Sequence, residues 1–179
     1  MRTIILDPGH GMGNRAPGRY DPGACAGKIE EASIALDWAN EIRGILQAQG
    51  HKVVRTRIDA KDPAPVSKRA SIAKDHKGEI MLSIHCNAAN GKASGSECIH
   101  RGNPAKASVL SKTCATALGI KDRGAKVEAD SQHGRLAVMS FQPCFLLEIG
   151  FIDNEGDRIA MLDPVKRKAA CEAIAKVLI

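Results

Sequence analysis

The sequence predicts one α/β domain in which a mostly parallel, twisted sheet is covered by helices on both faces. Three short runs, at residues 3–6, 80–84 and 144–149, are almost continuously apolar, as is typical of parallel strands buried on both sides. Amphipathic stretches separate these runs, and such alternation favours an open, mostly parallel sheet. With 179 residues, the chain fits a single domain over residues 1–179.

The individual elements can be placed in order along the chain. Five strands are predicted, at residues 3–6, 52–56, 80–84, 96–100 and 144–149. Four helices are predicted, at residues 30–49, 65–77, 104–118 and 164–178. Glycine follows each of the first three helices and proline begins the fourth, as is usual at helix ends. The stretches 11–28 and 120–135 are predicted to be loops long enough to carry function.

Composition narrows the classes of partner. The net charge of +6 favours anionic surroundings. Aromatic residues make up only 3% of the chain, however, and single-strand nucleic-acid binders rely on aromatic stacking, so we expect no nucleic-acid partner. No apolar run approaches the ~20 residues of a membrane span, and residues 1–30 lack the pattern of a signal peptide. We therefore expect synthesis in the cytoplasm.

Three separate strand ends carry side chains suited to metal binding or acid–base chemistry. His10 follows the first strand, His85 closes the run at 80–84, and Glu148 lies within the run at 144–149. In open α/β sheets, ligands bind outside the carboxyl ends of the strands. Each residue also has a structural explanation: a turn histidine, a strand-end histidine and a salt-bridged glutamate. A carboxylate inside an apolar strand is nevertheless costly unless it is paired or ligated.

Two histidines and a carboxylate that leave a fourth position open form a common catalytic zinc set. The carboxylate could come from Glu30 or Glu31, which open the first predicted helix. Carboxylates are also favoured there by the helix dipole alone, so the residue pattern does not choose between the two. The six cysteines include no C-x-x-C pair, and we expect buried thiols rather than ligands.

Several motifs together resemble one enzyme family. They are "LDPGHG", "DPGACAGKIEEASIALDWA", "VVRTRIDAKDPAPVSKRASIAK", "IMLSIHCNA" and "QPCFLLEIGFIDN". In this order they resemble the zinc-dependent N-acetylmuramoyl-L-alanine amidases of the amidase-3 family, over about residues 3 to 178. The resemblance implies hydrolysis of the amide bond between N-acetylmuramic acid and the L-alanine of the peptidoglycan stem peptide.

The resemblance also implies roles for particular residues. It implies that His10, Glu31 and His85 bind zinc, because Glu31 rather than Glu30 matches the family's spacing to the following Leu and Ala. It implies that Glu148 is the catalytic glutamate. His133 is a candidate for substrate contact. Three further residues have purely structural explanations as well. Asp7 either caps a turn or supports a ligand histidine. Arg69 and Asn87 match family positions, but buried hydrogen bonding also explains them.

One departure from the family pattern is the insertion "MGNRAPGRY" between "HG" and "DPGA", which puts substrate preference in doubt but not the chemistry. Neither a wall-binding repeat nor a Ser/Gly-rich linker is visible, so we expect no separate cell-wall-binding module. We expect a phage endolysin, made in the host cytoplasm and acting on the wall after release, and a monomer. The alternatives are a bacterial wall-remodelling amidase and a non-catalytic peptidoglycan-binding module.

Overall fold

The computed structural model describes residues 1–131 and 134–179 and contains a central sheet of six strands. In spatial order the strands are β6 (Lys52–Arg55), β1 (Thr3–Pro8), β7 (Ile80–Asn87), β10 (Cys144–Phe151), β8 (Ser96–His100) and β9 (Asp122–Val127). The first four are mutually parallel, whereas β8 runs antiparallel to β10 and parallel to β9. The prediction of a mostly parallel sheet is confirmed.

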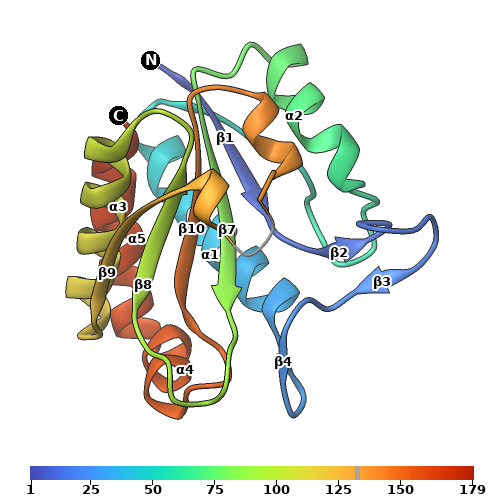
Figure 1. Cartoon of the computed structure of the whole chain (residues 1–179). Coiled ribbons are helices and arrows are strands. Elements are labelled where there is room, and N and C mark those ends of the chain that lie inside the picture. Colours follow the sequence, from blue (N-terminus) through green and yellow to red (C-terminus); the bar gives the residue numbers. More distant parts are fainter. Residues whose placement is uncertain (132–133) are drawn as a thin grey trace.

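Helices cover both faces of this sheet (Figure 1). On one face, α1 (Glu31–Ala48), α3 (Pro104–Leu118) and α5 (Pro164–Leu178) pack on a large apolar core together with α4 (Glu155–Leu162). On the other face, α2 (Val66–Asp75) and the short helix η2 (Ala137–Ser140) cover a smaller core. A second short helix, η1 (Glu128–Asp130), follows β9.

Side-chain alternation along each strand divides the core between the two faces. Ile4 and Leu6 of β1 belong to the larger cluster, while Ile5 between them belongs to the smaller one. This is the period of two expected for a strand. It explains the unbroken apolar runs at residues 3–6, 80–84 and 144–149, because both faces of these strands are buried.

Several features were not predicted, among them the two short helices η1 and η2. β9 lies within 120–135, which was predicted to be a loop. It is a polar edge strand, so its two faces are not both buried and its sequence lacks an apolar run. α4 is a helix of only eight residues, begun by the Asn154 side chain, which accepts a hydrogen bond from Asp157 N. The predicted loop 11–28 contains the short hairpin of β2 (Gly11–Met12) and β3 (Tyr20–Asp21). It also contains β4 (Cys25–Ala26), which pairs with β5 (Ile29–Glu30), so Glu30 belongs to a strand and the predicted helix begins one residue later, at Glu31.

None of the described helices is long and apolar enough to cross a membrane. The described cysteines are all free thiols, and five of the six are buried. The expectation of buried thiols is confirmed for these five, whereas Cys25 is exposed because it lies in the short hairpin of β4 and β5.

Candidate active site

The parallel strands bring the predicted functional residues to one edge of the sheet. β1 and β10 both pair with β7, and His85 on β7 is directly opposite Glu148 on β10. His10 follows β1 after a turn in which Gly9 N donates to Ile84 O of β7 at 3.0 Å. Carboxyl ends of parallel strands meet at the same edge, where α/β proteins bind ligands.

His10 is held in an unusual backbone conformation. Its φ of 58° lies in the left-handed region, which a non-glycine residue rarely occupies. Two buried arginines fix this turn: Arg57 donates to the carbonyl of Gly9 at 2.8 Å, and Arg69 donates to the carbonyl of His10 at 2.7 Å. The surroundings thus enforce a conformation that orients the imidazole.

Glu31, the first residue of α1, joins the two histidines. Its Oε1 lies 3.1 Å from His10 Nε2 and 2.9 Å from His85 Nδ1. The backbone amides of Cys86 and Ala24 also donate to its carboxylate, at 3.0 and 2.9 Å. Glu30, in contrast, accepts a hydrogen bond from Tyr20 Oη and is not part of this group.

The arrangement of His10, Glu31 and His85 suits a metal ion. One donor atom from each lies within 4.8 Å of the others, and the two imidazole rings are edge-on with centroids 5.0 Å apart. Burial raises the pKa of Glu31, but hydrogen bonds from His10 and His85 outweigh this effect and hold that pKa well below its ordinary range. The carboxylate is therefore ionised and available as a ligand.

Asp21, which directly follows the insertion, was not singled out from the sequence. Its Oδ2 lies 3.0 Å from His10 Nδ1, so it can accept the Nδ1 proton and leave Nε2 to face Glu31. Carboxylates commonly orient metal-binding histidines in this way. Asn14 also donates to Asp21, at 2.6 Å. The only sequence signal was its place in "DPGA", the first motif after the insertion.

Asp7 has neither of the roles considered for it. It is fully buried and accepts hydrogen bonds from Arg69 at 2.7 Å, Ser83 at 2.6 Å and Thr56 at 2.5 Å. It therefore braces β1 against its neighbours rather than supporting a histidine. Arg69 is buried and hydrogen-bonded, in agreement with the structural explanation given for it from the sequence.

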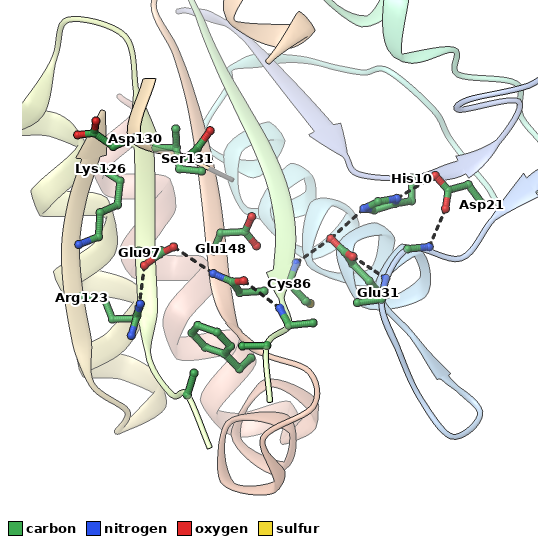
Figure 2. A pocket seen from close by; sticks show the side chains of 18 of the residues that line it. His10, Asp21, Glu31, Cys86, Glu97, Arg123, Lys126, Asp130, Ser131 and Glu148 are labelled. Atoms are coloured by element: carbon green, nitrogen blue, oxygen red, sulfur yellow. Dashed lines mark hydrogen bonds and ion pairs between the residues drawn. The ribbon is translucent and has the colours of Figure 1, made fainter. Parts of the chain in front are cut away.

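Glu148 lies beside the histidines with its Oε2 shielded from solvent and without a hydrogen-bond partner among the described residues. Burial, followed by the negative charges of Glu31 and Glu97, raises its pKa well above the ordinary range. In Figure 2, Glu148 lies between the Glu97–Arg123 pair on the left and the His10–Glu31 pair on the right. An unpartnered, buried carboxyl oxygen beside a group of candidate metal ligands makes Glu148 a candidate for proton transfer.

Two hollows meet at these residues. A cleft of about 770 Å³ extends from His10, Glu31 and Glu148 towards β9 (Figure 2). A smaller hollow of about 330 Å³ extends from His10, His85 and Glu148 towards α2 and η2. Arg15, from the inserted loop, lines both. A substrate extending on both sides of the reacting bond can therefore be accommodated.

His133, the candidate for substrate contact, lies outside the described residues. Asn87 lines the larger cleft, and its side-chain amide donates to Glu97 at 3.0 Å.

Comparison with known proteins identifies the family. Residues 4–179 match the amidase-3 family model, described as N-acetylmuramoyl-L-alanine amidase. The chain belongs to this family. The catalytic domain of CwlV, an N-acetylmuramoyl-L-alanine amidase from Bacillus (Paenibacillus) polymyxa var. colistinus, has the same fold, with a TM-score of 0.84 and 26% identity. That comparison covers 99% of this chain and 96% of the CwlV domain.

Curated amidases are also similar along nearly the whole chain. An uncharacterized cell wall amidase of Bacillus anthracis is 31% identical over 193 residues, which cover 97% of this chain and 34% of the relative. The germination-specific N-acetylmuramoyl-L-alanine amidase of Bacillus subtilis is 28% identical, over 98% of this chain and 77% of the relative. The chain thus spans about a third of the first of these proteins and three quarters of the second.

Proposed function

We propose that this amidase-3 domain hydrolyses the amide bond between N-acetylmuramic acid and L-alanine in peptidoglycan, using a zinc ion held by His10, Glu31 and His85. One observation carries the proposal. Two imidazoles and an ionised carboxylate converge beside Glu148, whose buried Oε2 has no hydrogen-bond partner among the described residues. The family membership supports the same reaction.

The donor set fits zinc. Two histidines and one glutamate supply three protein ligands and leave a fourth position open, which is typical of catalytic zinc sites. Magnesium and calcium prefer sites made of oxygen ligands, so two imidazoles argue against them. Asp21 adds the supporting carboxylate that such histidines usually have.

The chain's own residues provide the proton transfers. When bound, zinc lowers the pKa of the water that it ligates to ~7 and polarises a carbonyl group. Glu148 accepts a proton from the attacking water and donates it to the departing nitrogen of L-alanine. Burial raises the pKa of Glu148, which favours retention of the proton until the nitrogen takes it.

The test is hydrolysis of purified peptidoglycan by the intact chain, followed by mass spectrometry of the products. We expect new muramic lactyl carboxyl groups and new L-alanine amino groups, both abolished by a chelator and restored by added zinc. Glu148→Gln should retain zinc and lose at least about a hundredfold in rate. Glu172→Gln, an exposed glutamate on α5, is the matched control.

Two outcomes would contradict the proposal. Unchanged turnover in Glu148→Gln would remove that residue from its role. Wall binding without new termini would favour the alternative of a non-catalytic binding module. Metal analysis of the purified chain distinguishes zinc from other ions independently of activity.

For the biological setting we propose wall lysis by an endolysin, made in the host cytoplasm and reaching the wall after release. The net charge of +6 supports retention on an anionic wall. Wall remodelling is the second candidate, favoured by relatives named as a germination-specific amidase and as a probable cell wall amidase of Staphylococcus aureus. Expression in bacteria together with a membrane-permeabilising protein should lyse the culture if the chain acts as an endolysin. Intact cells with altered separation after division would favour wall remodelling.

A further inference from the structure

Four charged or titratable residues form a row across neighbouring strands. His85 on β7 is opposite Glu148 on β10, and Glu148 is opposite Glu97 on β8. Glu97 in turn contacts Arg123 on β9. Directly opposed residues in a sheet place their side chains on the same face. The row therefore crosses one face of the sheet, from the candidate metal ligands to the far side of the larger cleft.

Arg123 is held in a defined position at the end of this row. Its Nε donates to Glu97 Oε2 at 2.7 Å, and its guanidinium carbon lies 5.0 Å from the centroid of the Phe151 ring. Glu97 is fixed in turn, because Asn87 donates to its other carboxylate oxygen at 3.0 Å. The contacts with Glu97 and Phe151, together with the hydrogen bond from Asn87 to Glu97, preorganise this cation.

The outer edge of the guanidinium is left for a ligand. Within the part of the chain that the structure describes, the Nη1 and Nη2 atoms of Arg123 have no hydrogen-bond partner. Arg123 lines the larger cleft, as does Lys126 from the same strand (Figure 2). The two terminal nitrogens of an arginine match the geometry of a carboxylate.

The spacing of the row indicates where such a carboxylate would lie on the substrate. Neighbouring strands are ~4.8 Å apart, so β9 is about 10 Å from β10, which carries Glu148. An extended peptide covers ~3.3–3.6 Å per residue. The backbone of β9 therefore lies about three extended residues from Glu148. The Arg123 side chain extends back to Glu97 on the intervening strand β8, which brings its guanidinium to about the second residue from the reacting amide.

We propose that Arg123 determines substrate specificity by binding a free carboxylate on the second residue of the stem peptide, with Glu97 as its positioning residue. This inference rests on the proposed amidase function. Stem peptides whose second residue is D-isoglutamate carry this carboxylate, whereas those with D-isoglutamine carry a neutral amide at the same place. The amide cannot accept both hydrogen bonds and has no charge to complement the guanidinium.

The experiment compares two N-acetylmuramoyl peptides that differ only in having D-isoglutamate or D-isoglutamine at the second position. The zinc-loaded intact chain should cleave the acid with a kcat/KM about tenfold or more above that for the amide, as expected for a hydrogen-bonded charge. In Arg123→Gln this ratio should fall to about one. Because the ratio is taken within one preparation, it is independent of the fraction of chain that is folded.

Further variants separate specificity from general damage. Arg123→Lys keeps the charge but loses the planar pair of donors, so its ratio should be intermediate. Glu97→Gln retains Arg123 but removes the carboxylate that positions it, so the ratio of acid to amide cleavage should also fall in this variant. Lys112→Gln, which removes an exposed positive charge on α3, should keep both the ratio and the rates.

The outcomes distinguish this inference from the function on which it rests. Equal cleavage of acid and amide by the wild type would overturn the role of Arg123 while leaving the amidase function intact. An unchanged acid preference in Arg123→Gln would do the same. No cleavage of either peptide or of purified walls would contradict the amidase function, and the inference with it.

Discussion

Gly23 lies closer to two candidate metal ligands than any other residue type would allow. A Cβ at this position would lie 2.5 Å from Glu31 Oε2 and 2.7 Å from His10 Cδ2. Its φ of 71° is also left-handed. The glycine therefore permits both the turn and the close approach of this segment to the candidate metal ligands.

We predict that Gly23→Ala weakens zinc binding at least tenfold, because the added methyl group displaces Glu31 or His10. Competition with a chromophoric chelator measures the affinity. Gly27→Ala is a matched control, since Gly27 has a similar φ of 61° but nothing within 4 Å of a Cβ. Equal losses in both variants would attribute the effect to backbone strain instead of the clash.

Asp21 provides the second prediction at this scale. Asp21→Ala should reduce zinc affinity about 10–100-fold, because His10 loses the carboxylate that holds its ring and tautomer. Asp75→Ala removes an exposed carboxylate at the end of α2 and should leave the zinc affinity unchanged. If Asp21→Ala bound zinc as tightly as the wild type, the supporting role would be wrong.

The buried ion pair of Asp7 and Arg69 connects β1 with α2. This contact between elements helps to hold the site in place. The Arg69 guanidinium lies 2.7 Å from Asp7, and both side chains are almost fully buried. Burial raises the pKa of Asp7, but Arg69 and the hydroxyls of Ser83 and Thr56 outweigh it and lower that pKa below its ordinary value of 3.8. The ionised carboxylate is therefore part of the folded structure.

We predict that Asp7→Asn destabilises the fold by about 3–5 kcal/mol near neutral pH, since a buried guanidinium loses its counter-charge. Because the folded-state pKa of Asp7 is lowered, its stabilising contribution is present above pH 3.8 and is lost as the pH falls below that value. The difference between wild type and variant should therefore shrink in acid. Urea unfolding of the zinc-free proteins at several pH values measures this, and a constant difference would contradict it.

At the scale of elements, the sequence was informative wherever burial imposed a pattern. The strands at residues 3–6, 80–84 and 144–149 were predictable because both of their faces are buried, and the helix at 104–118 because proline and glycine mark its ends. The polar edge strand β9 gave no such pattern. Asp21 could not be found for a related reason, because only the folding of the inserted loop brings it to His10.

At the scale of the whole molecule, the candidate metal ligands connect segments that are distant in the sequence. His10 follows β1, Glu31 begins α1 and His85 lies on β7. A metal bound here should therefore stabilise the folded state, by ~4 kcal/mol at a free zinc concentration a thousand times its Kd.

We expect added zinc to raise the Tm of the chelator-treated chain, and His85→Ala to abolish most of this shift. His76→Ala, an exposed histidine at the end of α2, is the control. Differential scanning calorimetry at fixed free zinc makes the comparison. An equal shift in His85→Ala would place the stabilising ion elsewhere.

The strand order has a consequence for the growing chain. β10, which lies between β7 and β8, is the last strand in the sequence. A nascent chain that has emerged only as far as β9 already contains His10, Glu31 and His85, but it lacks both Glu148 and the strand that joins the two parts of the sheet. The strand that completes the sheet is thus also the strand that carries the proposed base. A chain that ends before residue 144 therefore contains the three candidate metal ligands but lacks the proposed base.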